Sequence, residues 1–189
     1  MIINNNGIDF FTKRRSVSVK ALKGPGPAIE ETLEILQSAL RVPDHGKLEP
    51  WRFIIILEEA KDRFIDIMFR RGQEISIDFD KLEKNKTNIL NSPLIVTTIC
   101  CTKESSKIPE IEQILSAGAL CLNVLNNFLV RGWGANWLTG WMAHDRVFVE
   151  EAFQLGADEF VAGFIYVGNY DEVSRERPRP EVADKVTWF

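Results

Sequence analysis

The side chains best suited to binding a charged ligand lie in two short stretches near the N-terminus. Arg14-Arg15-Ser16 places two guanidinium groups beside a hydroxyl, and this donor set suits a phosphate because arginine offers a rigid fork of N–H groups. Residues 41–45, Arg-Val-Pro-Asp-His, place an arginine at an expected helix end and present His45 after a sharp turn. Two adjacent arginines are more often a solvated surface patch, so the phosphate interpretation needs support from the rest of the chain.

Side chains for other kinds of chemistry are few. The two histidines, His45 and His144, have no cysteine or further histidine at metal-ligand spacing, so a metal site is poorly supported. No Ser or Cys has a convincing base beside it, and the chain has no dinucleotide-binding, Walker or nucleophile-elbow glycine motif. We interpret His144 as structural or surface. The pattern favours a site that binds an anion and leaves the chemistry to that ligand.

The composition is that of an ordinary soluble globular protein. The 189 residues, 45% apolar and 26% charged, suffice for one domain with a substantial core. The net charge of −4 argues against nucleic acid as a partner. Residues 1–27 hold five Lys and Arg against one Asp, so they carry +4 and the rest of the chain −8. A basic segment of this kind suits a small anionic ligand, and a plain solvated tail explains it equally well.

Cysteine usage and hydropathy favour the cytoplasm. Cys100, Cys101 and Cys121 lie in apolar stretches and indicate buried thiols of a reducing compartment. The N-terminus has no basic start followed by an apolar run, so no signal peptide is expected. The longest uncharged run, 114–130, contains three asparagines and falls slightly short of a membrane span. We therefore expect a core helix there and no membrane partner.

Hydrophobic periodicity predicts helices and strands packed in layers, an α+β domain. The helix at 109–131 is apolar or small nearly all round in its middle, and Ser116-Ala117-Gly118-Ala119 would let another backbone approach closely. A small domain has difficulty surrounding such a helix, so we predict that a partner subunit covers one face, with a central helix in a monomer as the alternative. Helices are expected at 9–15, 28–42, 59–71, 78–90, 109–131 and 145–155, and strands at 51–57, 94–101, 132–139 and 160–168.

The C-terminal tail ends in Trp188 and Phe189. These rings would be left in water if the tail were loose, so we expect it to dock, with the partner's sheet edge as a plausible place. The tail also carries Arg175, Arg177 and Arg179 around two prolines.

Taken together, these stretches resemble the FMN-dependent nitroreductase family, and most closely its compact, single-domain bacterial branch. Arg14-Arg15-Ser16, residues 41–45 and Glu49-Pro50-Trp51 are similar to its N-terminal signature. The ordered set of matches covers nearly the whole chain from about Asp9 onward. Later matches are Ser92-Pro93-Leu94-Ile95 entering a strand, Ser116-Ala117-Gly118 in the long helix, Gly132 with Trp137 at the next strand, and residues 163–168, Gly-Phe-Ile-Tyr-Val-Gly.

The resemblance implies a fold and an assembly. Residues 1–189 would form a single FMN-binding nitroreductase-like domain, with a central, mainly antiparallel sheet flanked by helices. The family forms homodimers with two FMN sites at the interface, each built from both chains, and here the C-terminal tail would dock on the dimer partner. This agrees with the partner predicted from the apolar long helix.

The resemblance also assigns site residues. Arg14, Arg15 and Ser16 of one chain would contact the ribityl-phosphate and ring edge of FMN, while Arg41 and His45 would reach the same flavin from the other chain. Trp137, Leu138 and Thr139 match the later flavin-contacting strand. Asn127 to Gly132 matches a stretch linked with the nicotinamide cofactor in relatives.

The chain departs from the family pattern in two places. Larger members carry a basic residue two places after the serine, where this chain has Ser18, so charge at flavin N1 must be stabilised in another way. Leu138 stands where compact relatives have a polar side chain, so only its backbone is able to serve. Arg177 and Arg179 resemble the C-terminal basic residues that bind phosphate in larger members, and a solvated basic loop is the alternative.

The implied function is an FMN-dependent oxidoreductase working by a ping-pong mechanism. NAD(P)H would pass a hydride to flavin N5 and leave, and an acceptor such as a nitroaromatic or quinone would take its place. Basic groups near the flavin would stabilise negative charge on the reduced ring. The alternatives are a non-catalytic flavin-binding or flavin-storage protein, in which Trp137 and Leu138 crowd the ring, and an interaction domain without cofactor.

Overall fold

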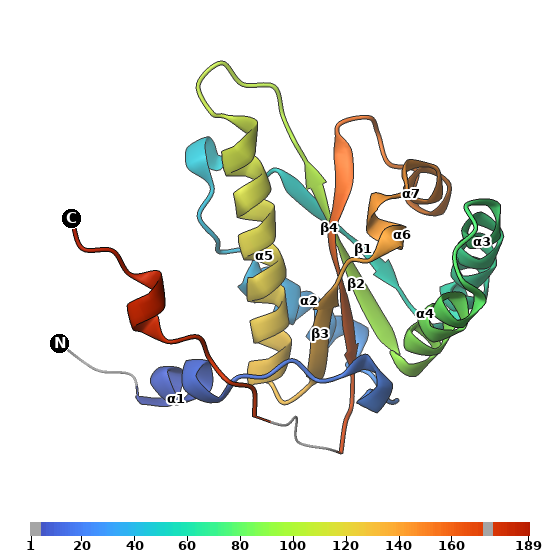
Figure 1. The fold of residues 1–189 in the computed structure, drawn as a ribbon, viewed down its shortest axis with the longest axis horizontal. Coiled ribbons are helices and arrows are strands. Elements are labelled where there is room, and N and C mark those ends of the chain that lie inside the picture. The colour runs from blue at the N-terminus through green and yellow to red at the C-terminus, as the bar shows by residue number, and fades with distance from the viewer. Residues whose placement is uncertain (1–4, 172–175) are drawn as a thin grey trace.

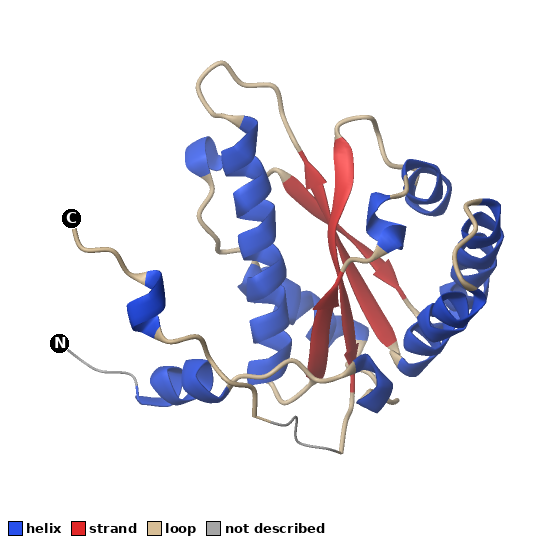
Figure 2. Ribbon diagram, viewed as in Figure 1, coloured by secondary structure: helices blue, strands red, loops and turns tan. Residues whose placement is uncertain are grey.

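Residues 5–171 and 176–189 are described by the computed structural model, in which helices cover both faces of a four-stranded sheet (Figures 1 and 2). The sheet has the order β1-β2-β4-β3, and every neighbouring pair is antiparallel. The strands are β1 (Trp51–Ile56), β2 (Leu94–Cys101), β3 (Gly134–Leu138) and β4 (Glu159–Gly168). The helices are α1 (Asn5–Lys13), α2 (Ile29–Ala39), α3 (Lys61–Glu74), α4 (Phe79–Asn91), α5 (Glu110–Val130), α6 (Trp141–His144) and α7 (Arg146–Phe153).

Two hydrophobic cores lie on opposite faces of the sheet. Alternate residues of a strand point to opposite faces, and β2 follows this rule because Val96 packs against α2 and α5 while Ile95 packs against the helices of the other face. The second face is covered by α3, α4, α6 and α7 (Figure 1). Because both faces of β2 and β4 are buried, their sequences are apolar without alternation, as expected for central strands.

The predicted α+β architecture is confirmed, with three local differences. Helix α1 ends at Lys13, so Arg14 and Arg15 follow the helix instead of belonging to it. The short helix α6 was not predicted, because four residues after Gly140 are too few to show a helical period. The prediction of three buried thiols is wrong for Cys101, which is partly exposed and contacts the carboxylate of Glu159.

Helix α5 presents one buried and one exposed apolar side. Its inner side packs on the sheet through residues such as Leu120 and Phe128, which are fully buried. Its outer side leaves four apolar side chains between 45% and 65% exposed: Ile111, Leu115, Leu122 and Val130. By length and composition alone, α5 would pass as a membrane span, and the core helix of a globular protein passes the same test.

The C-terminal tail contacts the end of α1 through Arg179 and then extends away from the sheet (Figure 1). Residues 176–189 are exposed along their whole length, and the side chain of Trp188 is 92% exposed. Within one chain, the tail therefore does not cover its terminal rings.

Close packing fixes Trp137 on the α5 face of the sheet. Its Nε1 donates to the carbonyl oxygen of Ala162 over 3.2 Å. A Cβ added at Gly163 would lie 1.9 Å from the same Nε1, so a glycine is required where the indole crosses β4.

One ion pair ties three segments at the upper end of the sheet. Arg52 of β1 donates from Nε and Nη2 to the two carboxylate oxygens of Glu159, over 2.7 and 3.0 Å. The backbone N–H of Gly156 donates to the same carboxylate over 2.9 Å. These donors favour the charged form, and the hydrogen bonds from Arg52 lower the pKa of Glu159 to about 2 from an ordinary value of 4.5.

We expect acid to weaken the fold through Glu159. A carboxyl whose folded pKa is depressed stabilises the protein above its unfolded pKa and loses that contribution as the pH falls toward the folded pKa, here from 4.5 to about 2. Between pH 7 and pH 3, the free energy of unfolding of the wild type should fall about 1–2 kcal/mol further than that of Glu159→Gln. Urea unfolding followed by tryptophan fluorescence measures the difference. Glu104→Gln, in an exposed loop, is the matched control, and equal acid sensitivity of Glu159→Gln and the wild type would contradict the assignment.

Candidate functional site

The free edge of β3 positions the N-terminal basic residues. The backbone N–H of Val17 donates to the carbonyl oxygen of Ala135 over 3.0 Å, and Asn136 Nδ2 donates to the carbonyl oxygen of Val17 over 2.7 Å. Val17 and Val19 are buried, whereas Ser16 and Ser18 are exposed. This alternation is that of an extended segment, so residues 14–18 are held along the sheet edge with the two serines facing outward.

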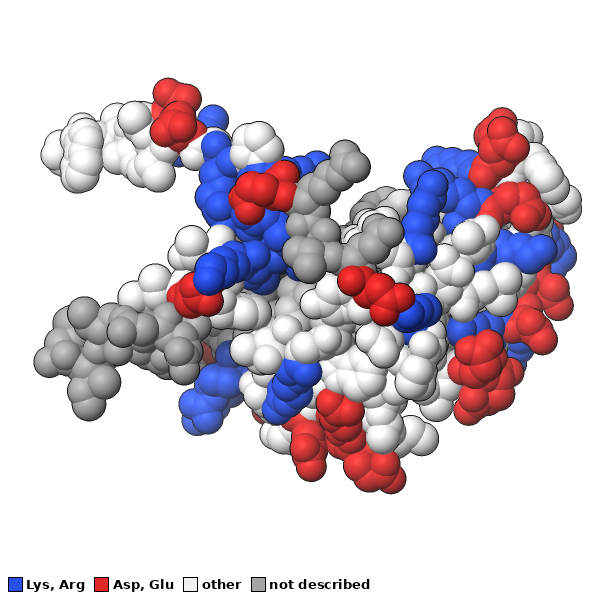
Figure 3. Space-filling view, turned by 90° about the horizontal axis from the view of Figure 1, so that it is seen from below, with Lys and Arg blue, Asp and Glu red and all other residues white. Residues whose placement is uncertain are grey.

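The C-terminal tail crosses this segment where α1 ends. Arg179 donates from Nη2 to the carbonyl oxygen of Thr12, and Arg15 pairs through Nη2 with Glu176. Glu176 also accepts from Arg179 Nη1 over 3.3 Å. Figure 3, which views the molecule from below, shows Lys and Arg side chains gathered on this face with acidic groups among them. The sequence-distant basic residues of the N-terminus and the tail therefore form one cluster.

Two cavities border the cluster. The larger, of about 660 Å³, lies between the end of α1, Leu129 at the end of α5 and Tyr170 after β4. The second, of about 520 Å³, is lined by Ser16 and Arg177 among others. Four residues line both cavities: Arg14, Arg15, Glu176 and Arg179.

Two hydrogen-bond donors of the cluster have no partner among the described residues. Among the residues that the structure describes, Arg14 Nη1 and Arg15 Nε are buried and have no hydrogen-bond partner. A buried donor without a partner costs about 1–3 kcal/mol, and more when it is charged. Arg15 in turn lowers the pKa of Glu176, as expected of a carboxylate beside a guanidinium. An oxyanion with several acceptor atoms would satisfy these donors, so the cluster is suited to binding one.

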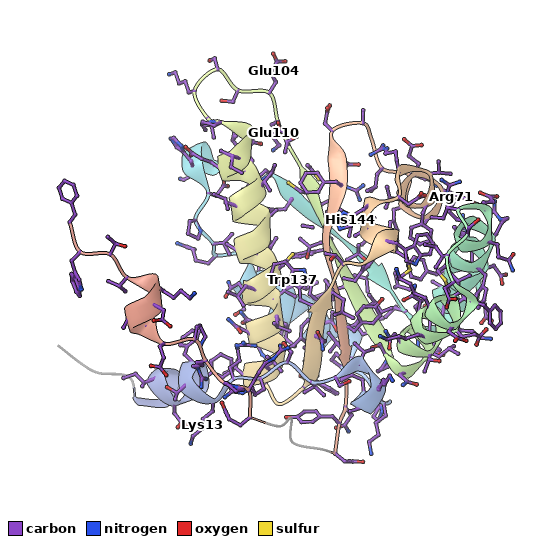
Figure 4. All side chains as sticks on the ribbon, in the orientation of Figure 1. Lys13, Arg71, Glu104, Glu110, Trp137 and His144 are labelled. Atoms are coloured by element: carbon purple, nitrogen blue, oxygen red, sulfur yellow. The ribbon has the colours of Figure 1, made fainter. Side chains whose placement is uncertain are left out.

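The structure does not bring His45 to this cluster, and Arg41, whose carbonyl oxygen accepts from Asn123 Nδ2 over 3.3 Å, lines neither of the two cavities. His45 contacts Glu112 near the start of α5, with Nδ1 and Oε2 2.6 Å apart, whereas the cavity wall includes Leu129 near its end. Seventeen residues of α-helix separate those two positions, which is about 25 Å. In Figure 4, the labelled Glu110 at the start of α5 and Lys13 at the end of α1 lie toward opposite ends of α5. Within one chain, His45 therefore stays apart from the arginine cluster.

The remaining predicted residues lie around the cluster. Residues 137–139 follow the sheet edge that holds residues 14–18, but they line neither of the two cavities. Asn127 lines a separate groove of about 360 Å³ between α1 and α5, and it accepts from Ser38 Oγ over 2.8 Å. Arg177 and Arg179 come to the site with the tail, while Arg175 lies outside the described residues.

Sequence reasoning missed Glu176. It lies between Arg175 and Arg177, in a stretch whose other charged residues are arginines, so the sequence analysis treated the stretch as basic. In the structure, its carboxylate pairs with Arg15 and Arg179. A single acid among arginines is the signal that would have identified it.

Comparison with known proteins matches the chain to one family. The model of the nitroreductase family matches residues 11–169. An Escherichia coli K12 protein named "Putative NAD(P)H nitroreductase YdjA" is 29% identical over 185 residues, which cover 97% of this chain and 100% of the relative. The crystal structure of a nitroreductase-like family protein from Bacillus cereus superposes with a TM-score of 0.83 at 18% identity, over 100% of this chain and 98% of the other. A Desulfovibrio desulfuricans structure, described as a "putative nitroreductase in complex with FMN", gives 0.74 at 19% identity over 97% and 96%.

Proposed function

Because the chain belongs to the nitroreductase family, we propose that it is an FMN-dependent oxidoreductase that uses NAD(P)H to reduce nitroaromatic, quinone or similar acceptors. We further propose that residues 1–189 act as one FMN-binding unit in a cytoplasmic homodimer. The free thiols of Cys100, Cys101 and Cys121 support that location, because reducing compartments keep cysteines unpaired.

The observation that carries the proposal is the pair of unsatisfied guanidinium nitrogens, Arg14 Nη1 and Arg15 Nε, beside the shared wall of two cavities. Guanidinium groups bind phosphate oxygens with charge-assisted hydrogen bonds. The residues present therefore fit the phosphate of FMN, with Arg14, Arg15 and Ser16 from one side and Arg177 and Arg179 from the tail. When bound, FMN supplies the hydride chemistry between the nicotinamide and the acceptor.

The protein's own residues position the cofactor and shape its surroundings. Residues 14–18 are immobilised by their bonds to β3, so the arginines are held before any ligand arrives. Ser18 and the backbone of Leu138 and Thr139 lie along the same edge and would meet the flavin ring. None of these side chains needs to act as a nucleophile.

A second copy of the chain would complete the site. His45 lies about 25 Å along α5 from the arginine cluster in one chain, and Arg41 lines neither of the cluster's two cavities. The outer side of α5 exposes apolar residues such as Leu115 and Leu122. Covering that side with a partner would bury the apolar stripe. It would also let Arg41 and His45 of the partner approach the first chain's cluster, as the family resemblance implies. The exposed tail would then find a surface on the partner.

Spectroscopy of the purified protein tests the function. We expect the visible absorption of bound flavin to bleach when NADH or NADPH is added without oxygen. It should return when 1,4-benzoquinone or 4-nitrobenzoate is added. Bound flavin that neither donor bleaches would overturn the reductase and favour the flavin-storage alternative. A protein that takes up no FMN would overturn both and leave the interaction domain.

Replacing Arg14 tests the cofactor assignment. Arg14→Ala removes a charged donor from the cluster, so we expect FMN binding to weaken by about 1.5–3 kcal/mol in a fluorescence titration. Lys20→Ala is the matched control, since it removes the same charge from the same basic segment at an exposed position and should bind FMN like the wild type. Equal affinity of Arg14→Ala and the wild type would count against the assignment.

Replacing Leu115 tests the second copy. Its side chain is 65% exposed in one chain, so Leu115→Glu should leave the isolated fold intact but place a charge in the proposed interface. We expect sedimentation to show a shift from dimer to monomer, with a parallel loss of FMN affinity. Val147→Glu, at a 47% exposed position of α7 on the other face of the sheet, should remain dimeric. A dimeric Leu115→Glu protein would contradict the use of this face.

A further inference from the structure

We propose that Glu176 is an internal anion that occupies the phosphate position of this site until a phosphorylated flavin displaces it, so that it lowers the affinity for FMN and leaves the affinity for riboflavin unchanged. The inference rests on the proposed function, because it takes the arginine cluster as the phosphate site. It adds a role for a residue of the tail that the family resemblance does not assign.

Glu176 lies where a ligand phosphate would have to lie. Its Oε1 pairs with Arg15 Nη2 and with Arg179 Nη1, so the carboxylate joins a guanidinium of the N-terminal segment to one of the tail. It also belongs to the wall shared by both cavities. A phosphate that reached Arg15 and Arg179 would therefore compete with this carboxylate for the same donors.

The carboxylate of Glu176 leaves some hydrogen-bond donors of the arginine cluster without a partner. The contacts of Glu176 with Arg15 and Arg179 both use Oε1, while Arg15 Nε and Arg14 Nη1 remain buried without a partner among the described residues. A phosphate monoester has three terminal oxygens and a charge of about −1.5 to −2 at neutral pH. It would engage the donors that Glu176 uses together with those that it leaves free. A phosphorylated flavin is therefore the better ligand of the two.

Displacing Glu176 is easy. Its side chain is 71% exposed, compared with 18% for that of Arg15, so the carboxylate can turn into water while the guanidinium stays in place. Exposed ion pairs contribute little to stability, and the released carboxylate regains its hydration. Glu176 thus partly neutralises the arginines when the site is empty, and its displacement adds little to the free-energy cost of binding FMN.

Riboflavin takes no part in this competition. Riboflavin carries no phosphate, so it cannot replace the contacts of Glu176 with Arg15 and Arg179. Glu176 therefore lowers the affinity of the site for FMN and leaves the affinity for riboflavin unchanged.

The test compares Glu176→Gln with the wild type, using full-length protein freed of flavin. Glutamine keeps the size of the side chain and removes its charge. In low salt we expect E176Q to bind FMN and inorganic phosphate about threefold to tenfold more tightly, in fluorescence titration and calorimetry respectively. The affinity for riboflavin should stay within about twofold, and the gain for FMN should shrink as salt screens the charges.

Glu181→Gln is the matched control, because it makes the same change at an exposed position five residues along the tail. If E181Q tightens FMN binding as much as E176Q, the effect is one of overall charge and the proposal is overturned. If wild type binds FMN and E176Q binds it equally or more weakly, Glu176 only tethers the tail, and the inference fails while the proposed function stands. If neither protein binds FMN or phosphate, both the inference and the proposed function fail.

Discussion

The interaction on which the site depends is the pairing of Val17 with the free edge of β3. One side of β3 is bonded to β4, and the other would present unpaired backbone groups to water. The bonds of Val17 to Ala135 and Asn136 cover part of that edge, and the burial of Val17 and Val19 anchors them. The two arginines before Val17 therefore take their position from the sheet. A cation held in this way binds an anion without first losing the freedom of a mobile tail.

The fold was largely predictable because the local spacing of apolar residues shows which helices and strands are buried. Strands β2 and β4 are apolar on both faces and α5 is apolar over most of its length, so their spans follow from periodicity. What escaped prediction depends on contacts between distant residues. The extended segment after Lys13 exists because Val17 meets Ala135, more than a hundred positions later. The partial exposure of Cys101 arises likewise from its place beside Glu159 at the end of the sheet.

The candidate site was predictable in its residue types and not in its geometry. Arg14, Arg15 and Arg179 carry donors that suit an anion wherever they lie, and the structure gathers them at two shared cavities. Spacing along the chain does not reveal that His45 lies near the opposite end of α5, because that depends on how the 41–50 segment packs against Glu112. It also does not reveal which acid neutralises which base. Glu176 has arginine neighbours in sequence, but its partners in space include Arg15, which lies 161 positions away.

A symmetric dimer would both complete the flavin site and cover the exposed apolar side of α5. In a two-fold symmetric pair, each surface meets the same surface of the other copy, so residue i contacts j and j contacts i. If two copies of α5 packed side by side in opposite directions, the start of one would lie beside the end of the other. The roughly 25 Å between His45 and the arginine cluster would then be spanned by the helix itself. On this proposed arrangement, burying Leu115 and Leu122 and assembling the flavin site are the same event. A chain that fails to dimerise would keep its arginines but lack the groups that reach the cofactor from the other side.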